Sequence, residues 1–330
     1  MQSNVFSYVL SLKPSKKIGF WVKIAVFAGL LTYIGHVLQQ QRFDWSSVQR
    51  QLQAVQYPER WAAALIVLTP VNWGFEAVKW QILLRRVELT NFWDAYRGVL
   101  AGVSLGFALP AQLGDTSGRV LSLRTNERAR AIGASLVSGG MQFYVALVFG
   151  SLAWAHHLTI VSSRANTAGR WLLVLLVGLS GLGVVFGLTR RPLLQWLEGR
   201  TIMRRFVTYW NVASQYSDRE IVLALGAATL RYLVFSTQFY LAIRLLGIDL
   251  PTAVSVSGIG LVFLAKTLTP AFNLLSDLGV REAASLWVFA PFGVPAPVLL
   301  SATLTLWVAN VLMPILVGLI WVWKLKLTAE

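Results

Sequence analysis

LPAQLGDTSGR, at Leu109–Arg119, interrupts an apolar stretch with a proline, a glycine, an acid and an arginine. A similar stretch, TPAFNLLSDLGVRE, occurs at Thr269–Glu282. Both contain Pro-Ala, then Leu-Gly, then charged residues, and a glycine precedes each proline by the same distance. Because proline removes a backbone donor and breaks a helix, the two stretches predict paired broken helices around one central site. The other interpretation is two ordinary kinked helices with a chance likeness.

The composition is that of a polytopic membrane protein. Of 330 residues, 56% are hydrophobic and 13% are charged, and the mean hydropathy is +0.60. The absence of cysteine excludes disulfides, thiolate nucleophiles and sulfur-ligated metals. The formal charge of +15 is expected to lie in cytoplasmic loops that face anionic headgroups. No nucleic-acid-binding motif accompanies the charge, so we expect no nucleic-acid partner.

Apolar segments of about 20 residues, the length that crosses a hydrocarbon core of ~30 Å, recur along the chain. About six full spans are expected, at 18–38, 61–84, 131–155, 171–188, 220–246 and 298–323. Two shorter apolar segments, 98–113 and 252–268, lead into the two broken stretches. The predicted organisation is a cytoplasmic head at 1–17 and two membrane repeats at 18–158 and 159–330. Within the second repeat, the basic and aromatic segment 189–219 is expected to lie on the headgroup surface.

The distribution of Lys and Arg indicates how the shorter segments enter the membrane. If 98–113 crossed fully, the arginines of 119–130 would fall outside, against the positive-inside bias. If both short segments dip in and return, most of the 29 Lys and Arg residues become cytoplasmic, and so do both termini. We therefore predict an all-α fold with two re-entrant helical hairpins that enter from opposite sides, as in inverted-repeat transporters. The cations left outside are Arg42, Arg50, Arg60, Arg164 and Arg170.

Three of the ionisable residues inside predicted spans, Glu76, Lys79 and Arg231, are candidates for a site. Glu76 and Lys79 are three residues apart and share a helix face. Burying such groups in lipid costs about 2.5–3.5 kcal/mol each, so they normally face a cavity or a partner. Arg231, which shares its helix face with Gln238, is expected either to counter the charge of Glu76 or to bind an anionic headgroup. The alternative for Glu76 and Lys79 is a mutually neutralised pair that only fixes packing.

The charged residues of the two broken stretches suggest an anion site. Asp115 is expected to cap a helix that begins after the break, with Arg119 on its first turn. Asp277 is expected to cap the second helix in the same way, with Arg281 and Glu282 on its first turn. Helix N-termini and a planar guanidinium both suit a phosphate. The alternative is a plain cap, with Arg119 extended to the cytoplasmic headgroups.

No catalytic constellation is recognisable in the sequence. It contains no Ser–His–Asp order, no HExxH and no P-loop. We therefore expect no catalytic residue, no cofactor and no metal site. With three histidines in the chain, a metal role for His156 and His157 is not expected.

Two runs resemble a known family. ALPAQLGDTSGRVLSLRTNERARAIGASLV, at 108–137, is similar to the central motif of the flippase-like, lysylphosphatidylglycerol-synthase transmembrane-region family. LTPAFNLLSDLGVREAASL, at 268–286, resembles its later Pro…Gly…Glu block, and the resemblance extends from about Trp61 to Trp323. It places Asp115 at the acidic position, where Glu is commoner in the family, Arg119 at the arginine and Glu282 at the acid of the second half.

The resemblance implies lipid translocation. Members include the flippase half of the multiple peptide resistance factor, which moves aminoacylated phosphatidylglycerol, and proteins linked to hopanoids or polyprenyl-linked sugars. This chain ends soon after its last predicted span, without the soluble aminoacyl-transferase domain of the fused members, so synthesis of the lipid by this chain is not expected. The family thus implies a lipid, but not which one.

The leading hypothesis is a flippase or lipid transporter of the bacterial inner membrane. It would bind the phosphate headgroup of an anionic, aminoacylated, polyprenyl-linked or hopanoid-type lipid and work by alternating access. One alternative is an intramembrane enzyme acting on a lipid phosphate or polyprenyl carrier. Another is a non-transporting partner of a separate lipid synthase. The expected substrate-binding residues are Glu76, Lys79, Asp115, Arg119, Arg231, Asp277, Arg281 and Glu282.

Overall fold

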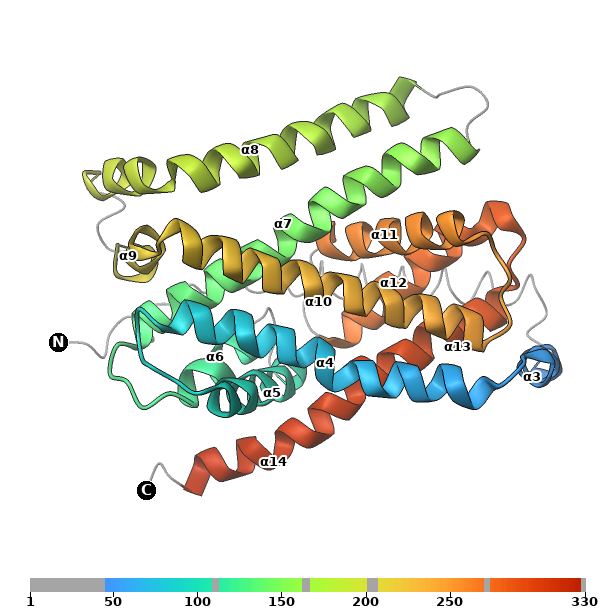
Figure 1. The fold of residues 1–330 in the computed structure, drawn as a ribbon, viewed down its shortest axis with the longest axis horizontal. Helices are drawn as coiled ribbons and strands as arrows, with labels where there is room; N and C mark the ends of the chain where they lie inside the picture. The colour runs from blue at the N-terminus through green and yellow to red at the C-terminus, as the bar shows by residue number, and fades with distance from the viewer. Residues whose placement is uncertain (1–44, 109–112, 162–166, 201–206, 270–273, 328–330) are drawn as a thin grey trace, which may run out of the picture.

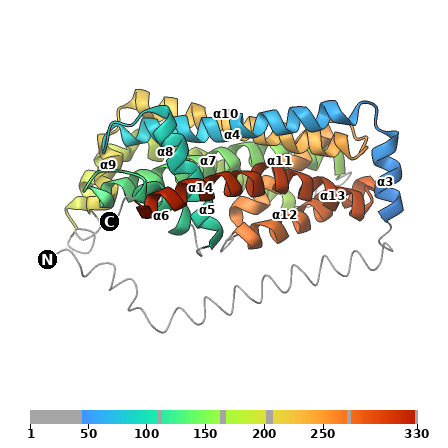
Figure 2. The ribbon, with the colours of Figure 1, turned by 90° about the horizontal axis from the view of Figure 1, so that it is seen from below.

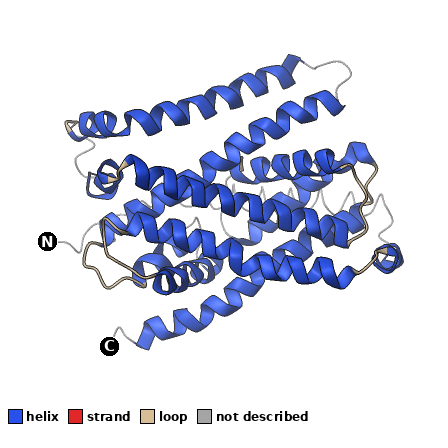
Figure 3. Ribbon diagram, viewed as in Figure 1, coloured by secondary structure: helices blue, strands red, loops and turns tan. Residues whose placement is uncertain are grey.

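The protein is described by a computed structural model that covers residues 45–108, 113–161, 167–200, 207–269 and 274–327. Within these ranges all regular structure is helical, as Figure 3 shows. Pro110 and Pro270, on which the prediction of broken helices rests, lie outside the described residues, as does the predicted span 18–38. The described helices are α3 Trp45–Ala54, α4 Pro58–Leu84, α5 Phe92–Ala108, α6 Leu113–Leu121, α7 Arg128–Val161, α8 Thr167–Glu198, α9 Val207–Gln215, α10 Asp218–Leu245, α11 Thr252–Leu268, α12 Leu274–Phe289, α13 Ala296–Trp307 and α14 Met313–Leu327.

The expectation of an all-α polytopic membrane protein is confirmed. Within the described residues, five helical stretches are long and apolar enough to cross a membrane. One of them joins α13 and α14 through the π-helix Val308–Leu312. The five candidate spans are Pro58–Leu84, Arg128–Ile160, Thr167–Glu198, Asp218–Leu245 and Ala296–Val322.

The packing centre is the pair α4 and α10, which lie side by side (Figure 1). Trp80 and Leu83 of α4 and Phe239 and Ile243 of α10 are fully buried in the main hydrophobic core. In the view of Figure 2, α4 and α10 run along one side of the bundle and α13 and α14 along the other. By contrast, α8 exposes most of its apolar side chains, such as Leu182 and Phe186, as expected of a helix that faces lipid.

Two pairs of shorter helices form hairpins. α5 packs along α6, and α11 packs along α12. α5 and α11 have 17 residues each, so each is ~25 Å long, shorter than a hydrocarbon core of ~30 Å. Figure 1 shows the two hairpins toward opposite ends of the bundle. That they are re-entrant in a bilayer, and that the halves are an inverted repeat, stay predictions.

The segment 189–219 differs from its predicted form. α8 continues as far as Glu198, and α9 is a short helix of nine residues. Arg190 is buried rather than spread on a surface, because its guanidinium donates to the backbone carbonyl of Tyr216 and pairs with Asp218. The first part of the segment is therefore continuous with α8 and is not a separate helix. That the segment lies on the headgroup surface stays a prediction, and residues 201–206 lie outside the described ranges.

Candidate functional site

A row of polar side chains follows one face of α4. Thr69, Asn72, Glu76 and Lys79 recur every three or four residues, a spacing that places them on one side of a helix. Asn72, Glu76 and Lys79 are buried where α4 packs against α7 and α10. This face therefore carries charge and amide groups into the interior of the bundle.

Glu76 is the centre of a buried ion cluster. Its Oε2 atom lies 2.8 Å from Lys79 Nζ and 3.2 Å from Arg231 Nη1, and Arg119 Nη1 donates to its Oε1 atom at 2.8 Å. The side chains of Glu76, Lys79 and Arg119 are 3%, 1% and 6% exposed, and that of Arg231 is 19% exposed. The expected Glu76–Lys79 pair and the expected pairing of Arg231 with Glu76 are confirmed.

Asp115 extends this cluster along α6. Arg119 Nε donates to Asp115 Oδ1 at 3.0 Å, and the Asp115 side chain is 34% exposed. We call Glu76, Lys79, Asp115, Arg119 and Arg231 the Glu76 cluster. The expected capping role of Asp115 is wrong, because α6 begins two residues earlier, at Leu113, and Arg119 lies on its last turn rather than its first.

Glycines let α6 pack closely against α5, the other helix of the first hairpin. A Cβ atom on Gly118 would lie 2.5 Å from Gly102 Cα, and one on Gly102 would lie 2.7 Å from the backbone oxygen of Asp115. Real side chains do not tolerate such distances, so α5 and α6 approach backbone to backbone. The tight hairpin sets the position from which Arg119 reaches Glu76.

Helix α7 supplies polar contacts that the sequence reading missed. Lys79 Nζ donates to the Ser138 carbonyl oxygen at 3.2 Å, and Arg231 Nη1 donates to Gln142 Oε1 at 3.2 Å. The Ser135 and Thr116 hydroxyls lie 3.1 Å apart. The signal was present in the sequence, since Ser135, Ser138 and Gln142 recur at helical spacing inside an apolar span.

Aromatic rings line the cationic side of the cluster. The Arg231 guanidinium lies 4.9 Å from the ring centroid of Trp73, and the Arg119 guanidinium lies 5.5 Å from that of Trp80. A ring face stabilises a cation without occupying its N–H donors. Arg231 Nε is buried and has no hydrogen-bond partner among the residues that the structure describes. The Nε–H group of Arg231 is thus a donor that an anionic ligand can use.

The second hairpin holds a separate buried pair. Arg281 Nη2 donates to Glu282 Oε1 at 3.2 Å, and their side chains are 0% and 7% exposed. Within the described ranges, Arg281 Nη1, Glu282 Oε2 and Ser285 Oγ have no hydrogen-bond partner. Within the described residues, no ion pair joins this pair to the Glu76 cluster. The structure therefore groups five of the predicted site residues in one cluster, while Arg281 and Glu282 pair with each other.

Asp277 was expected to cap the second helix. α12 begins at Leu274, so Asp277 lies within the helix and the capping prediction is wrong. Its side chain lies outside the described part of the structure.

An amide network adjoins the Glu76 cluster along α4. Asn72 Nδ2 donates to Asn310 Oδ1 at 2.9 Å, Asn310 Nδ2 donates to Gln238 Oε1, and Gln238 Nε2 donates to Thr69 Oγ1 at 3.1 Å. Asn310 belongs to the π-helix Val308–Leu312 between α13 and α14. Such π segments widen a helix locally and are frequent at functional sites. The network links α4, α10 and the last span.

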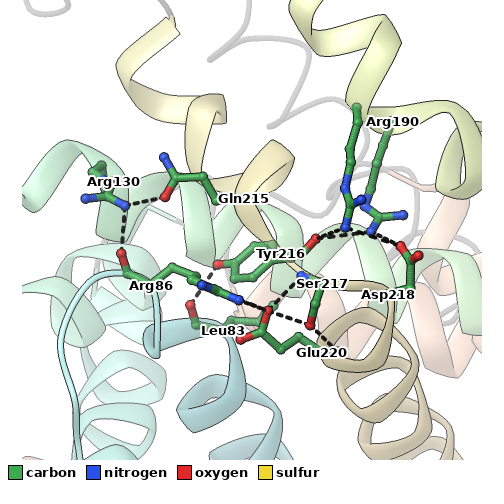
Figure 4. Close-up of polar contacts among 10 residues, drawn as sticks. Leu83, Arg86, Arg130, Arg190, Gln215, Tyr216, Ser217, Asp218 and Glu220 are labelled. Carbon is green, nitrogen blue, oxygen red and sulfur yellow. Dashed lines mark hydrogen bonds and ion pairs between the residues drawn. The ribbon is translucent and has the colours of Figure 1, made fainter.

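A group of polar contacts joins helix ends at one end of the bundle (Figure 4). We call the contacts of Arg86 with Glu220 and Arg130, together with the contact between Tyr216 and Leu83, the Arg86 latch. Arg86 Nη2 donates to Glu220 Oε2 at 2.8 Å, and Arg130 Nη2 donates to the Arg86 carbonyl oxygen at 2.7 Å. The Tyr216 hydroxyl donates to the Leu83 carbonyl oxygen at 2.7 Å. Burial, and after it the charge of Glu220, raises the pKa of the Tyr216 hydroxyl, so it keeps the proton that it donates. Ser217 caps α10 in a capping box with Glu220.

The latch joins segments far apart in the chain. It fastens the end of α4 and the start of α7 to the end of α9 and the start of α10, as Figure 4 shows. Many described cations gather at this end, which we call the Arg86 end. They include Arg85, Arg86, Arg124, Arg128, Arg130, Arg190, Arg191 and Arg219.

Comparison with known families gives an independent assignment. The lysylphosphatidylglycerol synthase TM region matches residues 20–318, a range that includes every residue of the Glu76 cluster, the amide network and the Arg86 latch. Among curated proteins no match to the chain was found. By the extent of the family match, the chain belongs to the lysylphosphatidylglycerol synthase TM region family.

Proposed function

We propose that this protein is a lipid flippase that binds the phosphate of a lipid headgroup at the Glu76 cluster and moves it across the membrane. The observation that carries the proposal is the position of Arg119 and Arg231 on the two oxygens of one buried carboxylate. A phosphate that competes with Glu76 for these cations would find two planar guanidinium groups at one point.

The depth of the cluster supports this proposal. Arg231 lies 13 residues after the start of α10, which is ~20 Å along the helix. Glu76 lies eight residues before the end of α4, which is ~12 Å. From these lengths we expect the cluster to lie well inside the thickness of the hydrocarbon core. Ionisable groups kept at such depth mark substrate or ion pathways.

The chemistry of the cluster favours a phosphate over an apolar ligand. Arg119 hydrogen-bonds Asp115 and Glu76 through Nε and Nη1, and among the described residues its Nη2 has no hydrogen-bond partner. Arg231 donates from Nη1, while its Nε has no hydrogen-bond partner in the described part of the chain. A guanidinium has five N–H donors, so both arginines can donate further hydrogen bonds to phosphate oxygens. The acyl chains would remain in the bilayer beside the bundle.

Alternating access would require the two ends of the bundle to open in turn. The Arg86 latch joins residues from both halves of the chain at one end of the bundle. In this proposal the latch keeps that end closed. Because Lys and Arg favour the cytoplasmic side, we take the Arg86 end to be cytoplasmic, with both termini on that side of a bacterial inner membrane. Opening of the latch would then give the cluster access to the inner leaflet.

The identity of the lipid follows from the proposal only by class. The family name refers to lysylphosphatidylglycerol, so anionic and aminoacylated phospholipids are the first substrates to test. Lipids with polyprenyl or hopanoid tails are further candidates, because the cluster would contact the headgroup rather than the tail.

A reconstitution experiment tests the proposal. Full-length protein is placed in vesicles that contain a fluorescent phosphatidylglycerol, and the rate at which the outer-leaflet label is replenished after chemical quenching is measured. We expect fast exchange with the wild type and with Arg97→Gln, which alters an exposed cation. Arg119→Gln should reduce exchange to the protein-free rate. Exchange at the protein-free rate with the wild type, or equal exchange with Arg119→Gln, would refute the proposal.

A further inference from the structure

The charges of the Glu76 cluster do not cancel. Lys79, Arg119 and Arg231 carry three positive charges, and Glu76 and Asp115 carry two negative charges. Among the described residues, no other charged side chain forms an ion pair with these five. Ser138 and Gln142 of α7, the remaining polar contacts, are uncharged. The cluster therefore has one positive charge in excess.

The depth of burial makes this excess matter. Four of the five side chains are less than one-fifth exposed, and only Asp115, at 34%, has substantial contact with the surroundings. Charges interact strongly where water does not screen them, so an uncompensated charge in such a site is costly. One bound negative charge would neutralise the cluster. A second negative charge would leave an anion without a counter-charge at the same depth.

Resting on the proposed function, we infer that the Glu76 cluster selects lipid phosphates that carry one negative charge, which are phosphodiesters, over phosphomonoesters that carry two. Glu76 and Asp115 are then more than partners that hold the cations in place. They set the net charge of the site and so determine which class of phosphate it accepts.

A competition experiment in detergent measures this selectivity without any transport. A fluorescent phosphatidylglycerol is bound to the purified full-length protein at about pH 7, where a phosphomonoester has lost most of its second proton. It is then displaced by unlabelled phosphatidylglycerol, phosphatidic acid or diacylglycerol. We expect phosphatidylglycerol to displace the label at a concentration about tenfold lower, or more, than phosphatidic acid does. Diacylglycerol, which has no phosphate, should not displace it.

Variants that change the charge of the site test the rule directly. Asp115→Asn and Glu76→Gln each raise the excess to two positive charges, so the preference for phosphatidylglycerol should fall to about one or invert. Asp115→Asn is the safer variant because Asp115 is partly exposed, whereas Glu76→Gln alters a buried group that three cations contact. The control is Asp94→Asn, which removes one exposed negative charge at the start of α5 and should leave the preference unchanged.

The outcomes separate the two claims. Saturable binding with equal affinity for phosphatidylglycerol and phosphatidic acid would overturn the charge rule and leave the proposed function standing. An unchanged preference in a folded Asp115→Asn protein, or an equal shift in Asp94→Asn, would also overturn it. If no phosphate lipid binds the wild-type protein saturably, both the charge rule and the proposed function fail.

Discussion

Arg119 on α6 and Glu76 on α4, 43 positions apart in the sequence, form a buried ion pair at 2.8 Å. Arg119 also binds Asp115 on its own helix, and Glu76 also contacts Arg231 on α10. Through these two residues the first hairpin is fastened to the central helix pair. The same contact thus positions the hairpin and gathers the cations of the candidate site.

Removing Arg119 should destabilise the fold, because its hydrogen bonds join α6 to the buried carboxylate of Glu76, although Lys79 and Arg231 still pair with that carboxylate. For Arg119→Ala we expect a loss of about 1.5–3 kcal/mol in the free energy of unfolding. The loss should be smaller when Glu76→Gln is also present, with a coupling of about 1–3 kcal/mol. Unfolding in mixed micelles measures both. Arg97→Ala, which removes an exposed ion pair, should change stability by less than about 1 kcal/mol; equal effects at the two arginines would contradict the prediction.

The close approach of α5 and α6 gives a second prediction. In Gly118→Ala the new methyl group would lie 2.5 Å from Gly102 Cα, so the hairpin must separate. We expect a loss of about 1–3 kcal/mol in unfolding free energy. The matched control is Gly181→Ala in α8, where a Cβ atom meets nothing within 4 Å and alanine favours the helix by about 0.5–1 kcal/mol. If both substitutions changed the unfolding free energy in the same direction, the close packing of α5 against α6 would be contradicted.

The Arg86 latch should be a moving part if transport alternates between the two ends. The chain has no cysteine, so Arg86→Cys and Glu220→Cys can be combined directly and joined with a short, cleavable thiol crosslinker. We expect crosslinking to slow lipid exchange about tenfold or more, corresponding to a barrier increase of at least ~1.4 kcal/mol, and cleavage of the linker to restore it.

The control for the latch joins two positions on one helix. Asp94→Cys and Arg97→Cys lie one turn apart on α5, so a linker between them should not affect exchange. Undiminished exchange in the crosslinked Arg86–Glu220 protein would show that this end does not open. The pair itself is expected to break readily, because the Arg86 side chain is 41% exposed and exposed ion pairs are weak.

Much of the fold could be predicted from the sequence because hydropathy and charge are local signals. Hydropathy indicated the described spans, and helical spacing placed Glu76 beside Lys79. Because a buried carboxylate is costly without a counter-charge, a cation was expected near Glu76, and Arg231 is one that provides it. Such arguments need only the helix period and the energetics of ions in an apolar medium.

Contacts between helices were harder to predict, because the helix period gives the face of a helix but not its neighbour. Nothing in the sequence places Gln142 opposite Arg231 or Tyr216 against the end of α4. Arg190 was expected to extend into the headgroups, yet its side chain is buried against the Tyr216 carbonyl oxygen and pairs with Asp218. Helix starts were also misplaced, since Asp115 and Asp277 looked like caps but lie within their helices.

The central claim is that the Glu76 cluster holds a lipid phosphate in transit. The most direct test is an experimental structure of the full-length protein in a lipid nanodisc containing phosphatidylglycerol, at a resolution that resolves headgroups. We predict a phosphate within about 3–4 Å of the guanidinium groups of both Arg119 and Arg231, with Glu76 displaced from at least one of them. Ordered lipid confined to the outer surface, with the Arg119–Glu76 and Arg231–Glu76 pairs intact and no headgroup between the helices, would contradict the account.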